Sequence, residues 1–273
     1  MARAAKGGAG KEVARTGTSK APAVLTDDYS KFEGRGMEGV DRDSFAIPFI
    51  IILQSGSPQL KKADPAYIED AEEGFIFNTV TQEVLDGDSG IMVVPCAFQR
   101  RYLQWADREY GAAGAAGFRG EHLPTSKVVA EAWTDEDGRL RVDDERNKQG
   151  KPIADLLVDT RTHYVIIAAE SGVYAPAVLA MASTQVKKSK GWMSRIDAIK
   201  YVTKDGALRT PPSFAHMYRM TTVPESNDQG SWYGWKVGDA EKIETDSPLF
   251  AAAEAFNATV NAGNVKVAER VQE

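Results

Sequence analysis

Three segments of the sequence interleave aromatic and basic side chains. A cation can bind a phosphate and an aromatic ring can stack on an unpaired base, and a single-stranded nucleic acid exposes both groups. A duplex keeps its base faces inside the stack and would make little use of exposed rings. The candidate contact residues are Arg100, Arg101, Tyr102, Trp105, Lys187, Lys188, Lys190, Trp192, Arg195, Lys200, Tyr218, Arg219, Trp232, Tyr233 and Trp235.

The spacing within these segments suits strands. Alternate residues of a strand share a face, so Arg100 and Tyr102 would lie together within the segment 98–105. In the segment 231–236, Gly234 stands opposite the Tyr and Trp side chains and would leave room for a planar group to approach the backbone. Each tryptophan could instead be buried in the core, which is the commoner position for that residue type.

The charge is segregated along the 273 residues, whose net charge is −6. Residues 1–20 carry five basic groups and one acid, and residues 186–219 carry eight basic groups and two acids. An acidic protein with one concentrated basic segment suits a polyanion that contacts only that segment. A solvated helix face with counter-charges nearby remains the alternative.

Known catalytic and metal-binding patterns are absent. The string at 7–11 resembles a phosphate-binding loop, but Glu12 stands where that motif needs Ser or Thr. The histidines His122, His163 and His216 have no zinc-site spacing, and Cys96 follows a proline in an apolar stretch with no activating partner. We therefore expect a protein that is not an enzyme and needs no cofactor or metal. Carboxylates brought together only by folding could still build a metal-dependent nuclease, which stays open.

The pattern of elements predicts a mainly β protein with minor α content. Strands do not alternate with helices, which argues against a doubly wound parallel sheet and favours an antiparallel barrel. We expect an OB-like (oligonucleotide/oligosaccharide-binding) barrel with inserted hairpins, one internal helix and a C-terminal helix. The expected strands are 47–53, 74–80, 91–105, 128–133, 139–142, 153–169, 173–184, 214–223 and 231–237, and the expected helices are 186–203 and 247–260.

The internal helix is amphipathic. Trp192, Ile196 and neighbouring apolar residues fall within an arc of about 120° on a helical wheel, which predicts one buried side. Lys187, Lys190 and Arg195 fall outside that arc.

The chain divides by composition into a disordered N-terminal arm (1–44), an OB-like β-rich domain (45–240) and an acidic linker with a helical tail (241–273). No apolar run approaches the length of a membrane span, and the N-terminus lacks the apolar region of a secretory signal. We expect a soluble protein of the cytoplasm.

Four strings, at 47–58, 73–81, 93–105 and 183–192, resemble a group of tailed-bacteriophage proteins. Some members of that group are assigned as single-stranded DNA-binding proteins of replication and recombination. The resemblance implies an OB-like core that coats single strands without catalysis, with the basic and aromatic residues above as contacts. The chain departs from such proteins at its end, 268–273, where mixed charges replace an acidic tail.

These observations predict a non-catalytic protein that coats single-stranded DNA during phage replication or recombination in the host cytoplasm. Its partners would be single-stranded DNA and phage replication or recombination proteins, with no membrane and with room for a homo-oligomer. The alternative is a phage protein-interaction module that binds a host or virion protein and no nucleic acid.

Overall fold

Two 15-residue strands, β4 (Ile91–Trp105) and β8 (Ala154–Ala168), form the centre of the main sheet in the computed structural model. The structure describes residues 28–40, 44–106, 117–143, 154–169, 171–228, 230–263 and 265. β4 and β8 pair antiparallel along most of their length. Both contain apolar runs because helices cover both faces of the sheet at this level.

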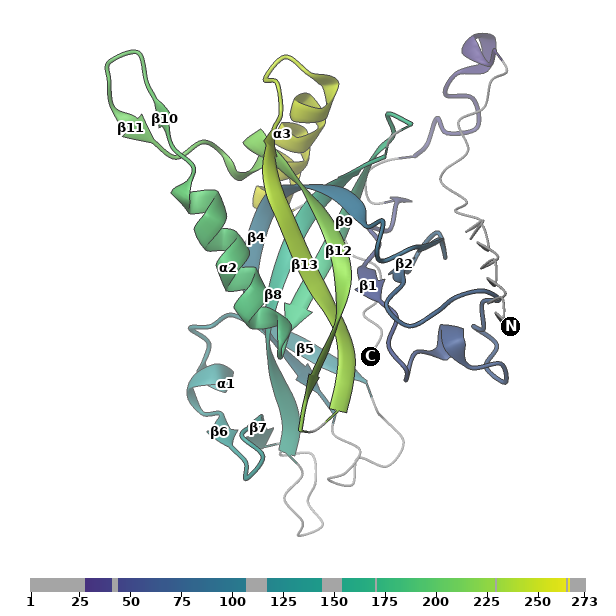
Figure 1. Cartoon of the computed structure of the whole chain (residues 1–273), viewed down its shortest axis with the longest axis vertical. Coiled ribbons are helices and arrows are strands. Elements are labelled where there is room, and N and C mark those ends of the chain that lie inside the picture. Colours follow the sequence, from purple (N-terminus) through teal and green to yellow (C-terminus); the bar gives the residue numbers. More distant parts are fainter. Residues whose placement is uncertain are drawn as a thin grey trace, which may run out of the picture.

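Shorter strands extend this antiparallel sheet on either side. β12 (His216–Asn227) and β5 (Phe118–His122) pair with successive parts of β4, and β9 (Tyr174–Ala182) and β7 (Leu140–Asp143) with parts of β8. β13 (Gly230–Lys242) and β6 (Trp133–Thr134) complete the order β13-β12-β4-β8-β7-β6. The sheet curls into a half-barrel (Figure 1), so the mainly β, barrel-like class predicted from the sequence is confirmed.

Pro95 lies at a β-bulge within β4. The register with β8 shifts between Pro95 and Ala97, which leaves Cys96 as the extra residue. A bulge tolerates a residue that has no N–H to donate to the ladder. Cys96 is fully buried, and burial raises the pKa of its thiol to about 12, in agreement with a buried, inert cysteine.

Each face of the sheet has its own apolar cluster. One face packs Val93, Val165 and Leu179 against helix α2 (Gln185–Ala198). The opposite face packs Val94, Ile166 and other residues against helix α3 (Pro248–Asn261), which is capped by Ser247. The predicted boundary at residue 240 falls inside β13, and α3 shares its core with the central strands.

A small three-stranded sheet packs on the α2 side of the half-barrel. It consists of β1 (Ile50–Ile52), β2 (Ile76–Asn78) and β3 (Val84–Leu85). Two glycines allow its close approach to the β12–β13 ribbon. A Cβ at Gly74 would meet the ring of Tyr233, and a Cβ at Gly87 would meet the Thr222 hydroxyl and the Gly74 carbonyl oxygen.

Side chains cover part of the outer edge of β13. The Gln54 amide exchanges two hydrogen bonds of 2.9 Å with the backbone of Tyr233. The Gln185 side chain accepts from the Trp235 N–H at 3.0 Å, and Arg195 donates to the Val237 carbonyl at 3.1 Å. These contacts protect an edge strand that would otherwise offer unpaired backbone groups to another chain.

The remaining elements are short. They are the 3-10 turns η1 (Ser30–Phe32), η3 (Pro58–Leu60) and η4 (Ser213–Ala215), helix α1 (Lys127–Ala130), and strands β10 (Tyr201–Val202) and β11 (Leu208–Arg209). The strand predicted at 128–133 is wrong in its first half, which forms α1 with Ser126 as its N-cap. Most of the arm predicted over 1–44 and most of the end of the tail lie outside the described residues. Across the described ranges, no helix combines the length and the apolar character needed to cross a bilayer.

Gly191, on the exposed side of α2, allows a test of the helix assignment and of the open space around this residue. Gly191 is exposed, and a Cβ added there would meet nothing within 4 Å. Gly191→Ala should raise the free energy of unfolding by about 0.5–1 kcal/mol, because Gly costs that much in a helix interior. Urea denaturation would measure the change.

The matched control is Gly87→Ala, where the new methyl would press on backbone and should lower the stability. Equal effects of the two substitutions would contradict the packing described here.

Candidate nucleic-acid interface

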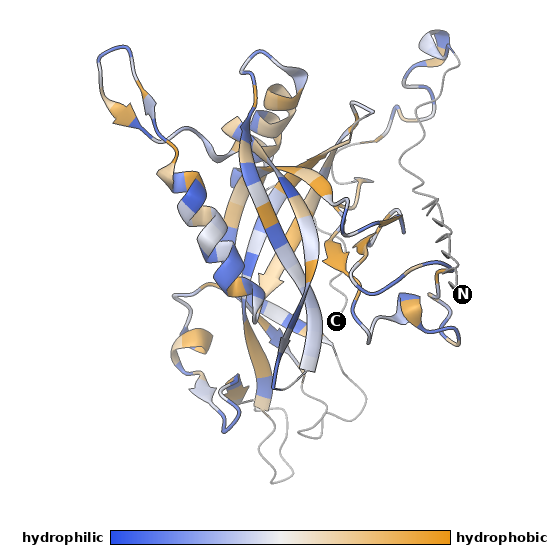
Figure 2. Ribbon diagram, in the orientation of Figure 1, coloured by the Kyte–Doolittle hydropathy of each residue, from blue (hydrophilic) through white to orange (hydrophobic). Residues whose placement is uncertain are grey.

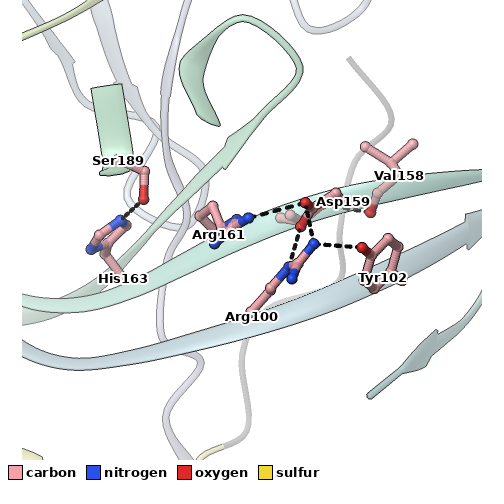
Figure 3. Close-up of polar contacts among 8 residues, drawn as sticks. Arg100, Tyr102, Val158, Asp159, Arg161, His163 and Ser189 are labelled. Atoms are coloured by element: carbon pink, nitrogen blue, oxygen red, sulfur yellow. Dashed lines mark hydrogen bonds and ion pairs between the residues drawn. The ribbon is translucent and has the colours of Figure 1, made fainter. Parts of the chain in front are cut away.

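The largest buried side chain of helix α2 is Trp192, which packs against the half-barrel. Trp192 is 1% exposed, and its ring stacks on His163 of β8 at 4.7 Å and meets Tyr218 of β12 edge-on at 5.6 Å. His163 Nε2 and Ser189 Oγ lie 2.7 Å apart in a second link to the helix (Figure 3). These contacts set which side of α2 faces the solvent.

His163 is neutral in this setting. Burial, together with the nearby charge of Arg161, lowers the pKa of His163 to about 3. A neutral imidazole can stack on the indole and hydrogen-bond Ser189 without carrying an unpaired charge into the core.

The outward side of α2 is cationic. Lys187, Lys190 and Arg195 are exposed, as the helical wheel predicted, and Ser189, Trp192 and Ile196 are buried. The only carboxylate on the helix is Asp197, against four cations. Figure 2 shows hydrophilic residues along this side of α2.

The basic/aromatic segments at 187–192 and 231–236 meet at Glu225, close to the start of α2. Lys188 Nζ lies 2.6 Å from Glu225 Oε1 of β12, and the Trp232 indole N–H of β13 donates to Glu225 Oε2 at 3.0 Å. Burial opposes ionisation of Glu225, but the hydrogen bonds from Lys188 and Trp232 outweigh it, so the pKa of this carboxyl is lowered. Lys188 therefore links α2 to β12, and its charge is neutralised by Glu225.

The space above Gly234 is filled. An added Cβ would lie 2.5 Å from Glu225 Oε2, 2.6 Å from Lys188 Nζ and 2.7 Å from Gln185 Nε2. The expectation that this glycine lets a planar ligand approach the backbone is wrong, because side chains of α2 and β12 occupy the place.

The first segment lies on β4 and is paired within the sheet (Figure 3). Arg100 donates to both carboxylate oxygens of Asp159, at 3.0 and 2.8 Å, and to the Tyr102 hydroxyl at 2.5 Å. Arg161 also donates to Asp159, at 3.1 Å. Burial would raise the pKa of Asp159, but the hydrogen bond from Arg100 and the charges of both arginines lower it.

Three further basic candidates have partners of their own. Arg101 lies 3.6 Å from Glu121 of β5, and Arg219 donates to the Ser89 carbonyl at 3.0 Å. Lys200 donates to the Asp197 carbonyl at 2.5 Å and to the Thr210 hydroxyl at 2.7 Å. Arg219 and Lys200 remain exposed, so these bonds position their charges at the surface.

Most of the aromatic candidates belong to the core. Trp192, Tyr218 and Trp235 are at most 4% exposed, and Tyr102 and Trp105 are 8% and 9% exposed. A base could not reach their faces without opening the core, so their assignment as nucleic-acid contacts is corrected. Trp232 and Tyr233 are half-buried.

The structure adds a hairpin that the candidate set did not contain. β10 and β11 follow α2 and project from the half-barrel (Figure 1), with Tyr201 49% exposed and Lys204 and Arg209 also exposed. Its turn contains Asp205-Gly206, and Asp-Gly is a pair that favours hairpins, as Asp137-Gly138 does between β6 and β7.

No cluster of three or more His, Cys, Asp or Glu side chains suited to a metal ion occurs among the described residues. For binding, the arrangement offers exposed cations on α2 and the hairpin and the exposed ring of Tyr201.

Fold and surface together define a mainly β half-barrel protein with a basic helix–hairpin edge. Residues 14–266 match the model of the family described as Pam3 phage gp34-like protein, and the chain belongs to this family. The predicted resemblance to bacteriophage proteins is thereby confirmed, and the single-stranded DNA-binding type stays a prediction. No curated protein and no solved structure matches the chain.

Truncating the anchor of α2 should affect stability. Trp192→Ala removes a fully buried ring, and we expect a loss of about 3–5 kcal/mol in the free energy of unfolding. Denaturant unfolding followed by circular dichroism measures it. Tyr201→Ala, which truncates a half-exposed ring, should stay within about 0.5 kcal/mol of the wild type.

The buried histidine should make stability depend on pH. The pKa of His163 is about 3 in the folded state against an ordinary value of 6.5, so only the unfolded chain gains this proton between those values. The contribution of the neutral His163 to the free energy of unfolding is complete above pH 6.5. Below that pH the free energy of unfolding decreases, and at pH 5 the loss is about 2 kcal/mol. Denaturation series at pH 7 and pH 5 measure the difference.

His163→Gln serves as the comparison, because it removes the titrating group and keeps a polar side chain. The variant should lose less stability than the wild type between pH 7 and pH 5. An equal loss in both proteins would exclude His163 as its source.

Proposed function

We propose that the protein is a non-catalytic single-stranded DNA-binding protein that coats phage DNA exposed in replication or recombination. The observation that carries this proposal is the outward side of α2, where Lys187, Lys190 and Arg195 stand exposed above a buried tryptophan. Their charges face the solvent, where they can bind an anionic partner.

The row of cations is long enough for a nucleic-acid backbone. At 1.5 Å per residue, Lys187 and Arg195 lie about 12 Å apart along the helix axis. Lys204 and Arg209 continue the basic surface beyond the end of α2. In the described part of the chain, neither Lys187 nor Lys190 is engaged in an ion pair.

An unpaired strand suits this surface better than a duplex does. Tyr201 is an exposed ring next to the cations, and an unpaired base offers it a face for stacking. Because the buried Trp192 fixes the orientation of α2, the cations are already in position before a strand binds. This preorganisation lowers the entropic cost of binding a flexible strand.

Binding of a fluorescent oligo-dT strand, compared with a duplex of equal length at low and high salt, tests the proposal. We expect saturable binding that is stronger for the single strand and weakens with salt, by about 0.7 log units per log unit of salt for each phosphate neutralised. Failure to bind the strand, or tighter binding of the duplex, would overturn the proposal.

Removing two of the exposed cations gives a sharper prediction. The variant Lys187→Ala/Lys190→Ala should bind the oligonucleotide more weakly and reduce its salt slope by about 1.4, because two phosphate contacts are lost. Fluorescence anisotropy at several salt concentrations measures both quantities.

Lys61→Ala/Lys62→Ala is the matched control, since it changes the net charge equally at two exposed lysines between β1 and β2. Equal weakening by both pairs would show that net charge alone governs binding and would exclude α2 as the contact surface.

A further inference from the structure

The β10–β11 hairpin is a small sheet of its own at the end of α2. Its two strands pair antiparallel, with Tyr201 opposite Arg209 and Val202 opposite Leu208. In the described structure neither strand joins another sheet. Figure 1 shows the hairpin extending away from the half-barrel.

The hairpin is held in shape at both of its ends. In the turn, the N–H of Thr203 donates to the Ala207 carbonyl at 2.9 Å, and the N–H of Ala207 donates to the Thr203 hydroxyl at 3.0 Å. At the base, Lys200 links the last turn of α2 to Thr210 through its two hydrogen bonds. The hairpin therefore extends α2 in a defined direction.

The two faces of the hairpin differ in chemistry. Directly opposed residues share a face, so one face carries Tyr201 with Arg209 and the other carries Val202 with Leu208. Val202 and Leu208 are 66% and 70% exposed. A two-stranded hairpin is marginally stable in water by itself, so a ligand that covers these side chains would also stabilise it.

We propose that this hairpin captures unpaired bases, with Tyr201 stacking on one base and Arg209 binding an adjacent phosphate. Val202 and Leu208 cover the apolar surface of a neighbouring nucleotide. The inference rests on the proposed function, because the strand that reaches the hairpin is the one that Lys187 and Lys190 hold. Lys200, Lys204 and Arg209 outnumber the one carboxylate of the hairpin, Asp205, so the charge around the exposed ring favours an anionic occupant.

Substitutions at Tyr201 test this assignment with the full chain and oligo-dT as the probe. Tyr201→Ala should weaken binding about 10-fold with little change in the salt slope, because base stacking involves no phosphate. Arg209→Ala should weaken binding and reduce the slope by about 0.7. Tyr201→Trp should keep the affinity and add tryptophan quenching on binding beyond that of the wild type.

Phe45→Ala is the control, since it removes a ring of similar exposure, 55%, from the segment before β1. It should bind like the wild type. Equal loss for Phe45→Ala and Tyr201→Ala would overturn the specific role of the hairpin.

The remaining outcomes separate this inference from the proposed function. If Tyr201→Ala binds like the wild type while Lys187→Ala/Lys190→Ala binds weakly, the hairpin inference is overturned and the proposed function stands. If the wild type binds no oligonucleotide, the proposed function fails and the inference fails with it. If Val202→Ser/Leu208→Ser changes the mass measured by light scattering and leaves the affinity unchanged, the hairpin contacts protein and the inference is overturned.

Discussion

The seating of Trp192 between β8 and β12 is the contact on which the arrangement of the surface depends. Its ring lies on a neutral His163 and against Tyr218, so α2 cannot rotate about its axis without exposing a large apolar side chain. The same seating turns Lys187 and Lys190 toward the solvent. Because the hairpin β10–β11 continues from the last turn of α2 through Lys200, its direction follows from that of the helix.

The basic segment contains one cation that is neutralised within the fold and others whose charges stay exposed. Lys188 pairs with Glu225, whereas Arg195 donates to the neutral Val237 carbonyl of β13 and keeps its exposed charge. Both contacts fasten α2 to the β12–β13 ribbon. The half-barrel thus gains a protected edge from residues whose type alone suggests nucleic-acid contact.

Much of the fold could be predicted because it follows from local patterns. The apolar run at 91–105 matches β4, and an Asp-Gly turn marks the β6–β7 hairpin. The 3.6-residue period predicts α2, but the helix expected over 186–203 ends at Ala198, and Tyr201–Val202 form β10 instead. The segment at 128–131 was misjudged because Val128 and Val129 favour strands, whereas the cap at Ser126 starts a helical turn there. Residues 224–227 continue β12 and pair with residues 230–233 of β13, although the polar residues at 225–227 gave no strand signal.

The candidate site could be predicted only in part. The sequence by itself determined which residues are charged, which are aromatic, and that Trp192 and Lys187 lie on different sides of one helix, because these properties depend on composition and on a local period. Only the tertiary structure decided that Trp235 and Tyr218 are buried, that Glu225 neutralises Lys188, and that Tyr201 stands exposed. Those outcomes depend on which distant elements cover each side chain, and packing across the curled sheet sets that.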